Sequence, residues 1–459
     1  MLWSWIGSVR RSSVIASFWM RNITFVDRVE VPGVTTITSA NLHLYDVDDD
    51  GDIELIIGHW DLGDLDPNVA SVCPNGSLLI LKYGRVWKSC CDLHMVTCVT
   101  AGRLCSKEKP SIVALCADSR CCIFDATSKG ESNDASLSLV CNQQIACNAK
   151  DACVLEGGIF FLPHLDVLKD GPCDMAVAYS DRIVRLFRWV PGKSSGKGTG
   201  ELVLLIKWEL AGQISRISLH STPTMSNLIL ASQPGGGFAF LQKKFESYEG
   251  RMCPTLVYHP PKITPNQNME MRTWIVGSLK SNLSGVADYL IGLCLADGTI
   301  HLLSADLQKS GTIWSVSLPV NGELFGLSRF DLTSDGSDEL AVCCWDGSTY
   351  IFNHEKDILH FPVGQTCQAF TAGRLAMSPR RNEPVLIYAT CEQSTLIYHN
   401  LDVQSIPSCS LLHALAAQPD VMGRLQQFSG HSSEPGMLRK SIHHLLYELP
   451  RHRSRLGRP

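Results

Sequence analysis

The sequence lacks the paired cysteine spacing that a disulfide framework or a zinc site would show. Its 459 residues include 19 cysteines, an odd number, and no two of them are arranged as C-x-x-C. Three pairs are adjacent: Cys90/Cys91, Cys121/Cys122 and Cys343/Cys344. Neighbours on a strand point to opposite faces, so such pairs form neither a disulfide nor a zinc corner readily. The sequence therefore predicts buried, reduced thiols and a cytosolic or nuclear protein.

Charge of one sign and long hydrophobic runs are also scarce. Charged residues make up 19% of the chain and the formal net charge is -5, too small to indicate nucleic acid or a membrane surface as the main partner. No apolar stretch approaches the length of a membrane span, so we expect a soluble protein. Residues 1–19 carry two arginines and short apolar runs that do not suit a signal peptide. We interpret them as an N-terminal extension, either a transit peptide or the result of a start placed upstream of Met20.

Motifs that carry catalysis are missing as well. The sequence has no H-E-x-x-H motif. Residues 192–196, GKSSG, fit G-x-S-x-G, but no helix pattern follows them, and Pro191 stands where a Walker A loop needs its first glycine. His443 and His444 are adjacent on a predicted helix, so they point apart. We therefore predict a protein that is not an enzyme and has no catalytic residues.

What the sequence does contain is an internal repeat. The phrase TAGRL occurs at 100–104 and 371–375, each time followed by an apolar run, a polar turn and a second apolar run. This hairpin pattern recurs seven times at a mean spacing of about 55 residues, measured at Leu55, Val113, Ala176, Ile229, Leu290, Leu340 and Leu386. One four-stranded sheet with its loops needs about that length. The pattern predicts an all-β fold, a seven-bladed β-propeller over residues 20–402.

The repeat also predicts details of the blades. Weaker apolar segments at 96–100 and 324–330 are expected to be innermost strands, and residues 24–31 should close the ring beside the strand 394–399. Asn75–Gly76, Asp297–Gly298 and Asp346–Gly347 are typical of tight hairpin turns. Four segments fit no strand and are expected to be loops: 59–74, 126–150, 191–200 and 242–285.

The pattern changes after residue 402. Residues 403–450 have helical spacing, with apolar stripes at Leu411, Leu412, Leu415 and at Ile442, Leu445, Leu446, Leu449. We predict a C-terminal helical pair, followed by a basic tail at 451–459.

One acidic stretch has the spacing of a cation-binding loop. Residues 46–54, DVDDDGDIE, place the carboxylates of Asp46, Asp48 and Asp50 around a bend at Gly51. Asp52 would add its main-chain carbonyl and Glu54 would close a set of oxygen ligands for Ca²⁺ or Mg²⁺. An EF-hand needs a bidentate glutamate at position twelve of the loop, where this sequence has Ile57, so the loop is not an EF-hand. The alternative is that the acids cap a turn without a metal.

The same spacing of acids recurs in two other copies, each of which lacks the acid at the third position. Residues 331–339 have Thr333 at the third place, and residues 166–174 have Leu168 there. In all three loops we expect a structural role, and any bound ion would stiffen the turn without reacting. No other cofactor is predicted.

These motifs resemble those of a known family. The acidic stretch that enters an apolar strand is similar to the FG-GAP repeat of integrin α-subunit propellers. A closer resemblance, to the integrin-α FG-GAP repeat-containing subunits of the KICSTOR complex, is carried by residues 46–58, MVTCVTAGRLC (95–105), YSDRIVRLFRW (179–189), residues 313–352 and LLYELP (445–450). Residues 1–19 and the insert 59–74 depart from that family.

The resemblance implies a function by assembly. It implies a scaffold subunit that pairs with a kaptin-like propeller and a large scaffold subunit. The complex would hold the GATOR complex at the cytosolic face of the lysosomal membrane and restrain the TOR kinase when amino acids or glucose are scarce. The alternative is an extracellular, calcium-stabilised integrin-like adhesion propeller, which would need a signal peptide and paired cysteines.

Overall fold

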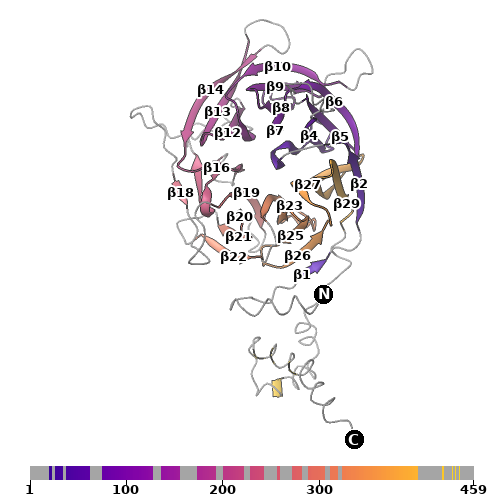
Figure 1. Ribbon diagram of the computed structural model, residues 1–459, viewed down its shortest axis with the longest axis vertical. Helices are drawn as coiled ribbons and strands as arrows, with labels where there is room; N and C mark the ends of the chain where they lie inside the picture. The colour runs from indigo at the N-terminus through magenta and orange to yellow at the C-terminus, as the bar shows by residue number, and fades with distance from the viewer. Residues whose placement is uncertain are drawn as a thin grey trace, which may run out of the picture. The chain divides into compact units, whose positions relative to one another are not determined.

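Seven β-sheets stand around a ring in the computed structural model of the protein (Figure 1). The structure describes residues 20–22, 26–34, 38–61, 75–127, 136–155, 173–192, 200–221, 228–241, 256–258, 271–281, 288–304, 311–318 and 323–401, with isolated positions between 426 and 444. Six of the sheets have four strands and the seventh has five. The predicted all-β, seven-bladed propeller is confirmed.

In five of the seven sheets all four strands follow one another along the chain, and consecutive strands of a sheet pair antiparallel. The first four sheets contain β3 (Leu42–Tyr45), β4 (Glu54–Asp61), β5 (Asn75–Lys82) and β6 (Arg85–Leu93); β7 (Val96–Gly102), β8 (Ser111–Cys116), β9 (Arg120–Asp125) and β10 (Ser138–Gln144); β11 (Ala149–Leu155), β12 (Asp174–Tyr179), β13 (Ile183–Pro191) and β14 (Gly200–Glu209); β15 (Ile217–His220), β16 (Leu228–Ser232), β17 (Phe238–Leu241) and β18 (Leu256–Tyr258).

The other three sheets complete the ring. They contain β19 (Thr273–Ser281), β20 (Asp288–Leu295), β21 (Thr299–Ser304) and β22 (Thr312–Ser317); β23 (Leu324–Phe330), β24 (Glu339–Cys344), β25 (Ser348–Phe352) and β26 (Ile358–Pro362), with β1 (Met20–Asn22) as the fifth strand; β27 (Cys367–Ser378), β28 (Arg381–Thr390), β29 (Ser394–His399) and β2 (Asp27–Pro32). Two short 3-10 helices, η2 (Ser39–Asn41) and η4 (Pro234–Gly236), are also present.

The two ends of the propeller meet in one blade, which we call the closing blade. Strand β2, from the start of the chain, pairs antiparallel with β29, with Glu30 opposite Leu396. This pairing confirms the prediction that the N-terminal strand closes the ring beside residues 394–399. Because β2 covers the outer edge of β29, the first and last parts of the ring are joined by backbone hydrogen bonds.

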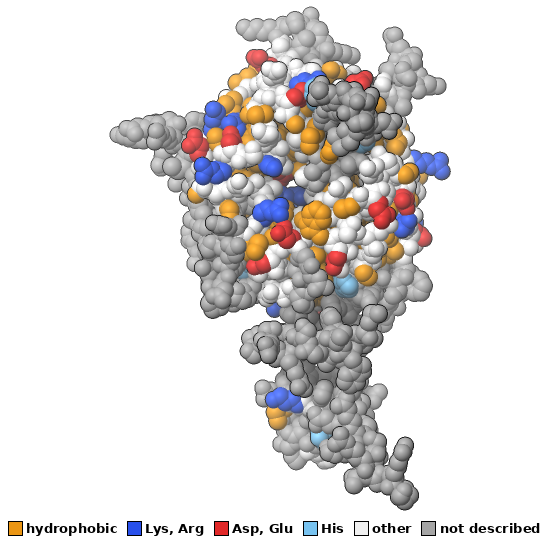
Figure 2. All heavy atoms as spheres, in the orientation of Figure 1, with side chains coloured by type: hydrophobic (Ala, Val, Ile, Leu, Met, Phe, Trp, Pro, Cys, Tyr) orange, Lys and Arg blue, Asp and Glu red, His pale blue; other side chains and the backbone are white. Residues whose placement is uncertain are grey.

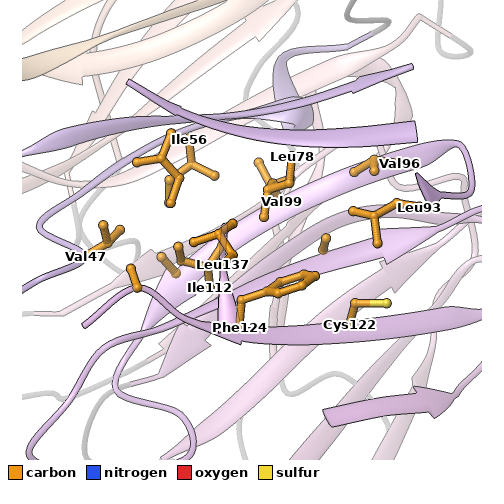
Figure 3. Close-up of a cluster of buried hydrophobic side chains, with 14 of the residues drawn as sticks. Val47, Ile56, Leu78, Leu93, Val96, Val99, Ile112, Cys122, Phe124 and Leu137 are labelled. Carbon is orange, nitrogen blue, oxygen red and sulfur yellow. The ribbon is translucent and has the colours of Figure 1, made fainter. Parts of the chain in front are cut away.

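The core lies between the sheets because the middle strands of the blades are apolar on both faces. Every residue of β8, β12 and β24 is buried. Figure 3 shows one such cluster between the first two blades, where Ile56 and Leu78 of the first blade face Ile112 and Phe124 of the second. Val47, from the acidic stretch, belongs to the same cluster and is fully buried. The acidic turn is therefore anchored in the core through its second residue.

Three expectations were wrong. Segments 126–150 and 242–285 were expected to hold no strand, yet they contain β10, β18 and β19. Strand β10 is largely half-buried or exposed, so its residues carry little apolar alternation. Asn75–Gly76 was expected to form a turn, but β5 begins there and pairs with the end of β4. The two Asp-Gly turns are confirmed by positive φ at Gly298 and Gly347.

The predicted C-terminal helical pair at 403–450, the basic tail and residues 1–19 lie outside the described residues, apart from isolated positions. Within the part of the chain that is described, no helix has the length and apolar character needed to cross a bilayer. Figure 2 shows one face of the molecule, on which acidic and basic side chains are interspersed among hydrophobic ones.

Candidate functional site

The predicted cation loop forms the connection between β3 and β4, and backbone groups shape it. Asp46 accepts hydrogen bonds from the backbone N–H of Asp50 at 3.2 Å and of Gly51 at 2.9 Å. Gly51 has a φ of 91° and Asp49 a φ of 63°, values that glycine and aspartate tolerate best. The Asp46 carboxylate thus caps the turn, as the alternative interpretation of the sequence expected.

A lysine lies among three of the other acids. The Nζ atom of Lys82, at the end of β5, is 2.8 Å from Asp48, 2.6 Å from Asp50 and 2.9 Å from Glu54. The lysine side chain is 9% exposed and that of Glu54 is 0% exposed. The ammonium group of Lys82 also lies 5.0 Å from the ring centre of Trp87 and 5.7 Å from that of Tyr83. We call this arrangement the lysine clasp.

Burial and charge act in opposite directions on the groups of the clasp. Burial raises the pKa of Glu54 to about 7, against the attraction of Lys82. Burial also raises the pKa of Asp48. At Asp50 burial acts in the same direction, but the hydrogen bond and charge of Lys82, the backbone N–H of Asp52 and a hydrogen bond with Asp48 together outweigh it and lower the pKa. Burial alone would lower the pKa of Lys82, but the three carboxylates raise it. The ammonium therefore stays charged, and its hydrogen bonds are charge-assisted.

Asp52 faces away from the clasp, toward the closing blade. It accepts hydrogen bonds from the backbone N–H of Arg380, at 2.8 and 3.1 Å, and from the hydroxyl of Tyr83, at 2.6 Å. The side chain of Asn382 bridges two backbone groups of the turn, accepting from Ile53 N–H and donating to Gly51 C=O, both at 2.8 Å. The turn is thus tied to residues about 330 positions further along the chain.

An arginine of the repeated phrase TAGRL holds the other side of the turn. Arg103, just after β7 in the second blade, lies 2.6 Å from the carboxylate of Asp49. In the last copy of the phrase, Arg374 contacts the corresponding turn before β24, at 2.9 Å from Ser334 and 3.4 Å from Asp331. Asp49 and Ser334 occupy the same place in their turns and both have positive φ. In these two blades the repeated arginine therefore links the blade to the acidic turn of the blade before it.

In the two weaker copies of the acidic motif, the final acid contacts a different group in each case. In the turn before β24, Asp331 caps Asp335 and Gly336, and Glu339 accepts from the N–H of Leu332 at 2.7 Å. Burial raises the pKa of Glu339 to about 7. In the copy at 166–174, Asp166 and Asp170 lie outside the described residues, but the final acid, Asp174, forms a two-bonded pair with Arg188 at 2.7 and 2.9 Å.

The predicted ligand set is therefore brought together only in part. Asp46, Asp48 and Asp50 can each offer one oxygen within 4.8 Å of the others. The carboxylate of Asp52, whose main-chain carbonyl was the predicted ligand, points to the closing blade, and Glu54 contacts Lys82. Sequence reasoning missed the partners Lys82, Arg103, Arg380 and Asn382. The repeat of TAGRL was a signal for the arginine, whereas the insert between β4 and β5 hides the register that places Lys82 opposite Glu54.

Comparison with known proteins identifies the family. The family model described as integrin-alpha FG-GAP repeat-containing protein 2 matches residues 82–403, which is most of the propeller. The chain belongs to this family. Its match begins at Lys82, so the acidic turn itself precedes the matched range.

Two curated relatives match almost the whole chain. The KICSTOR complex protein ITFG2 of Mus musculus is 28% identical over 456 residues, covering 93% of this chain and 96% of the relative. The Bos taurus protein of the same name is 30% identical over 436 residues, covering 87% of this chain and 75% of the relative. A resemblance to integrin-α FG-GAP proteins was therefore correct.

Solved structures show the same fold. The crystal structure of BBS1N in complex with ARL6DN, soaked with lead, superposes with a TM-score of 0.56 at 13% identity, covering 84% of this chain and 99% of that chain. The mercury-soaked crystal gives a TM-score of 0.55. At this identity the likeness extends to the propeller fold alone.

Proposed function

We propose that the protein is a non-enzymatic propeller subunit of a KICSTOR complex. The observation that carries the proposal is the similarity to two curated KICSTOR complex proteins over most of the chain. In this function the propeller pairs with a kaptin-like propeller and a large scaffold subunit. The assembly holds the GATOR complex at the cytosolic face of the lysosomal membrane and restrains the TOR kinase when amino acids or glucose are scarce.

The chemistry of the acidic turn supports a structural role. Every carboxylate of the turn contacts a basic side chain, a hydroxyl or a backbone N–H, and the contacts join three blades. A nucleophile or general base must instead face a substrate with its reactive atom exposed to it. A turn that is held by three blades in this way suits a protein that presents a fixed surface to its partners.

The cysteines bear on the alternative, an extracellular adhesion propeller. The cysteines of the described segments are free thiols, and many are buried, among them Cys98, Cys294 and Cys343. Disulfides form and persist in extracellular proteins, and extracellular modules bind calcium with dissociation constants of roughly 0.1 to 1 mM. This chain offers reduced thiols in the core, which favours a reducing compartment.

Co-purification tests the proposal directly. The tagged chain is expressed at its natural level, and lysosome-rich membranes and cytosol are isolated from fed and amino-acid-starved cells. Mass spectrometry should find the other KICSTOR subunits and GATOR components enriched with the tagged chain, relative to a tag-only control. In cells that lack the chain, TOR kinase activity should persist during starvation. A chain that co-purifies with none of these subunits contradicts the proposal.

A further inference from the structure

The acidic motif predicts a bound cation, but its carboxylates already surround a positive charge. We propose that the ammonium group of Lys82 takes the place of the metal ion, so that the first blade is closed without calcium or magnesium. The inference concerns the stability of the propeller and does not depend on the partners proposed above.

The geometry of the clasp leaves little room for an ion among these ligands. Lys82 Nζ lies 2.6 to 2.9 Å from oxygens of Asp48, Asp50 and Glu54, the separations of charge-assisted hydrogen bonds. Calcium would sit about 2.3 to 2.6 Å from the same oxygens. An ion bound to these oxygens would therefore overlap the ammonium group and would have to displace it.

The other two predicted ligands serve different partners. Both oxygens of Asp46 accept backbone N–H groups of the turn. Both oxygens of Asp52 accept the N–H of Arg380, and one also accepts the Tyr83 hydroxyl. The Asp52 carboxylate would have to leave these donors to join an ion beside Asp48, so Asp52 could contribute only its main-chain carbonyl, as the sequence predicted. With Lys82 among the oxygens of Asp48, Asp50 and Glu54, the predicted side-chain ligands do not fit a metal site in this conformation.

The position of the lysine recurs in another blade. Lys82 follows Leu81, which pairs with Leu55 across the β4–β5 hairpin, so the lysine faces Glu54, the final acid of the motif. In the β12–β13 hairpin, Arg188 pairs directly with Asp174, the final acid of its own copy. Two of the three copies thus place a base on the strand opposite the last acid. Such cross-strand pairs of opposite charge stabilise a sheet.

The copy at residues 331–339 has no lysine or arginine opposite its final acid. Asn353 follows Phe352, the partner of Leu340, and therefore stands where the other copies have lysine or arginine. The final acid there, Glu339, contacts backbone N–H and a threonine hydroxyl in place of a cation. The clasp is therefore a property of particular copies, set by one residue of the second hairpin strand.

Replacement of the lysine tests the proposal. Lys82→Met keeps the length of the side chain and removes its charge, which leaves three carboxylates together without a cation. Lys207→Met, at an exposed position of β14, is the matched control. Each protein is melted in chelator and in about 1 mM Ca²⁺ or Mg²⁺, a level that saturates most protein calcium sites. Calorimetric titration of the wild type with Ca²⁺ provides a readout that needs no variant.

We expect the wild type to melt at one temperature in all three conditions and to give no heat of calcium binding. In chelator, Lys82→Met should melt at least about 3 °C lower, because it leaves the buried Glu54 and the partly buried Asp48 without a cation, while Lys207→Met should melt as the wild type. A wild type that binds calcium, or that melts higher with it, overturns the proposal. So does a Lys82→Met protein that melts as the wild type in chelator.

Discussion

Replacing Asn382 by alanine tests whether the acidic turn helps to hold the ring closed. Asn382 lies at the start of β28 in the closing blade, and its side chain bonds Ile53 N–H and Gly51 C=O of the first blade at 2.8 Å each. The variant removes both bonds and leaves the neighbouring contact between Ile53 C=O and Ala376 N–H, at 2.9 Å, in place. The perturbation is therefore confined to the join between the two blades.

The magnitude follows from the exposure of the two groups. A hydrogen bond contributes about 0.5 to 1.5 kcal/mol net, and the bond to Gly51 is exposed, so water can replace it. The half-buried N–H of Ile53 is less easily satisfied, and we expect a total loss of about 1 to 2 kcal/mol. A propeller spanning Asn22–Asp402 has an unfolding entropy of roughly 0.8 kcal/mol/K. The melting temperature should therefore fall by about 1 to 3 °C.

Two measurements and two further variants sharpen the test. Scanning fluorimetry gives the melting temperature, and hydrogen exchange followed by mass spectrometry reports on the peptide that contains Ile53, which should exchange faster in the variant. Asn382→Asp keeps an acceptor for Ile53 but adds a carboxylate to the acidic turn, so it should lose more stability than alanine. Asn142→Ala removes an exposed amide from β10 and serves as the control. If Asn382→Ala melts as the wild type and Ile53 exchanges unchanged, the turn does not stabilise the closure.

Three other perturbations test separate features of the propeller. Burial raises the pKa of Glu339 to about 7, so its favourable contribution is present in acid and is lost as the pH rises through 7; Glu339→Gln should melt higher than the wild type at pH 8 and similarly at pH 5. In Gly58→Ala, the new methyl would lie 2.6 Å from a methyl of Val96, and this overpacking should lower the melting temperature by roughly 1 to 4 °C. A chain that begins at Gly33 lacks β2 and leaves the edge of β29 uncovered, so its soluble yield should fall sharply compared with a chain that begins at Met20.

The repeated hairpin was enough to predict the fold. Middle strands such as β8, β12 and β24 are buried on both faces, so they appear in the sequence as unbroken apolar runs at a regular spacing. The outer strands were harder to find. Strand β10 faces solvent along much of its length, so its sequence, SLVCNQQ, carries no clear period. The number of blades could therefore be predicted, while several strand boundaries could not.

The candidate site, like the fold, could be predicted from the sequence only in part. The acids and the glycine of the turn are contiguous, so local rules located them and predicted both a metal and a plain cap. Lys82 lies 28 residues after Glu54, beyond an insert that hides the register of the hairpin, although the strands themselves pair regularly up to Leu81. Arg380 and Asn382 reach the turn only because the ring closes. No local pattern could have placed them there.

The arrangement also explains why so many acids can stand beside a buried strand. Close pairs of like charges near a surface repel by on the order of 1 kcal/mol each, so a turn with six acids needs compensation. Here the compensation comes from the first blade through Lys82, from the second through Arg103 and from the closing blade through the N–H of Arg380. Asp49 meets Arg103, and Asp52 meets Arg380, only when the first blade stands between the second blade and the closing blade. These two acids therefore favour the complete ring, and the order of the blades, over any partly assembled alternative.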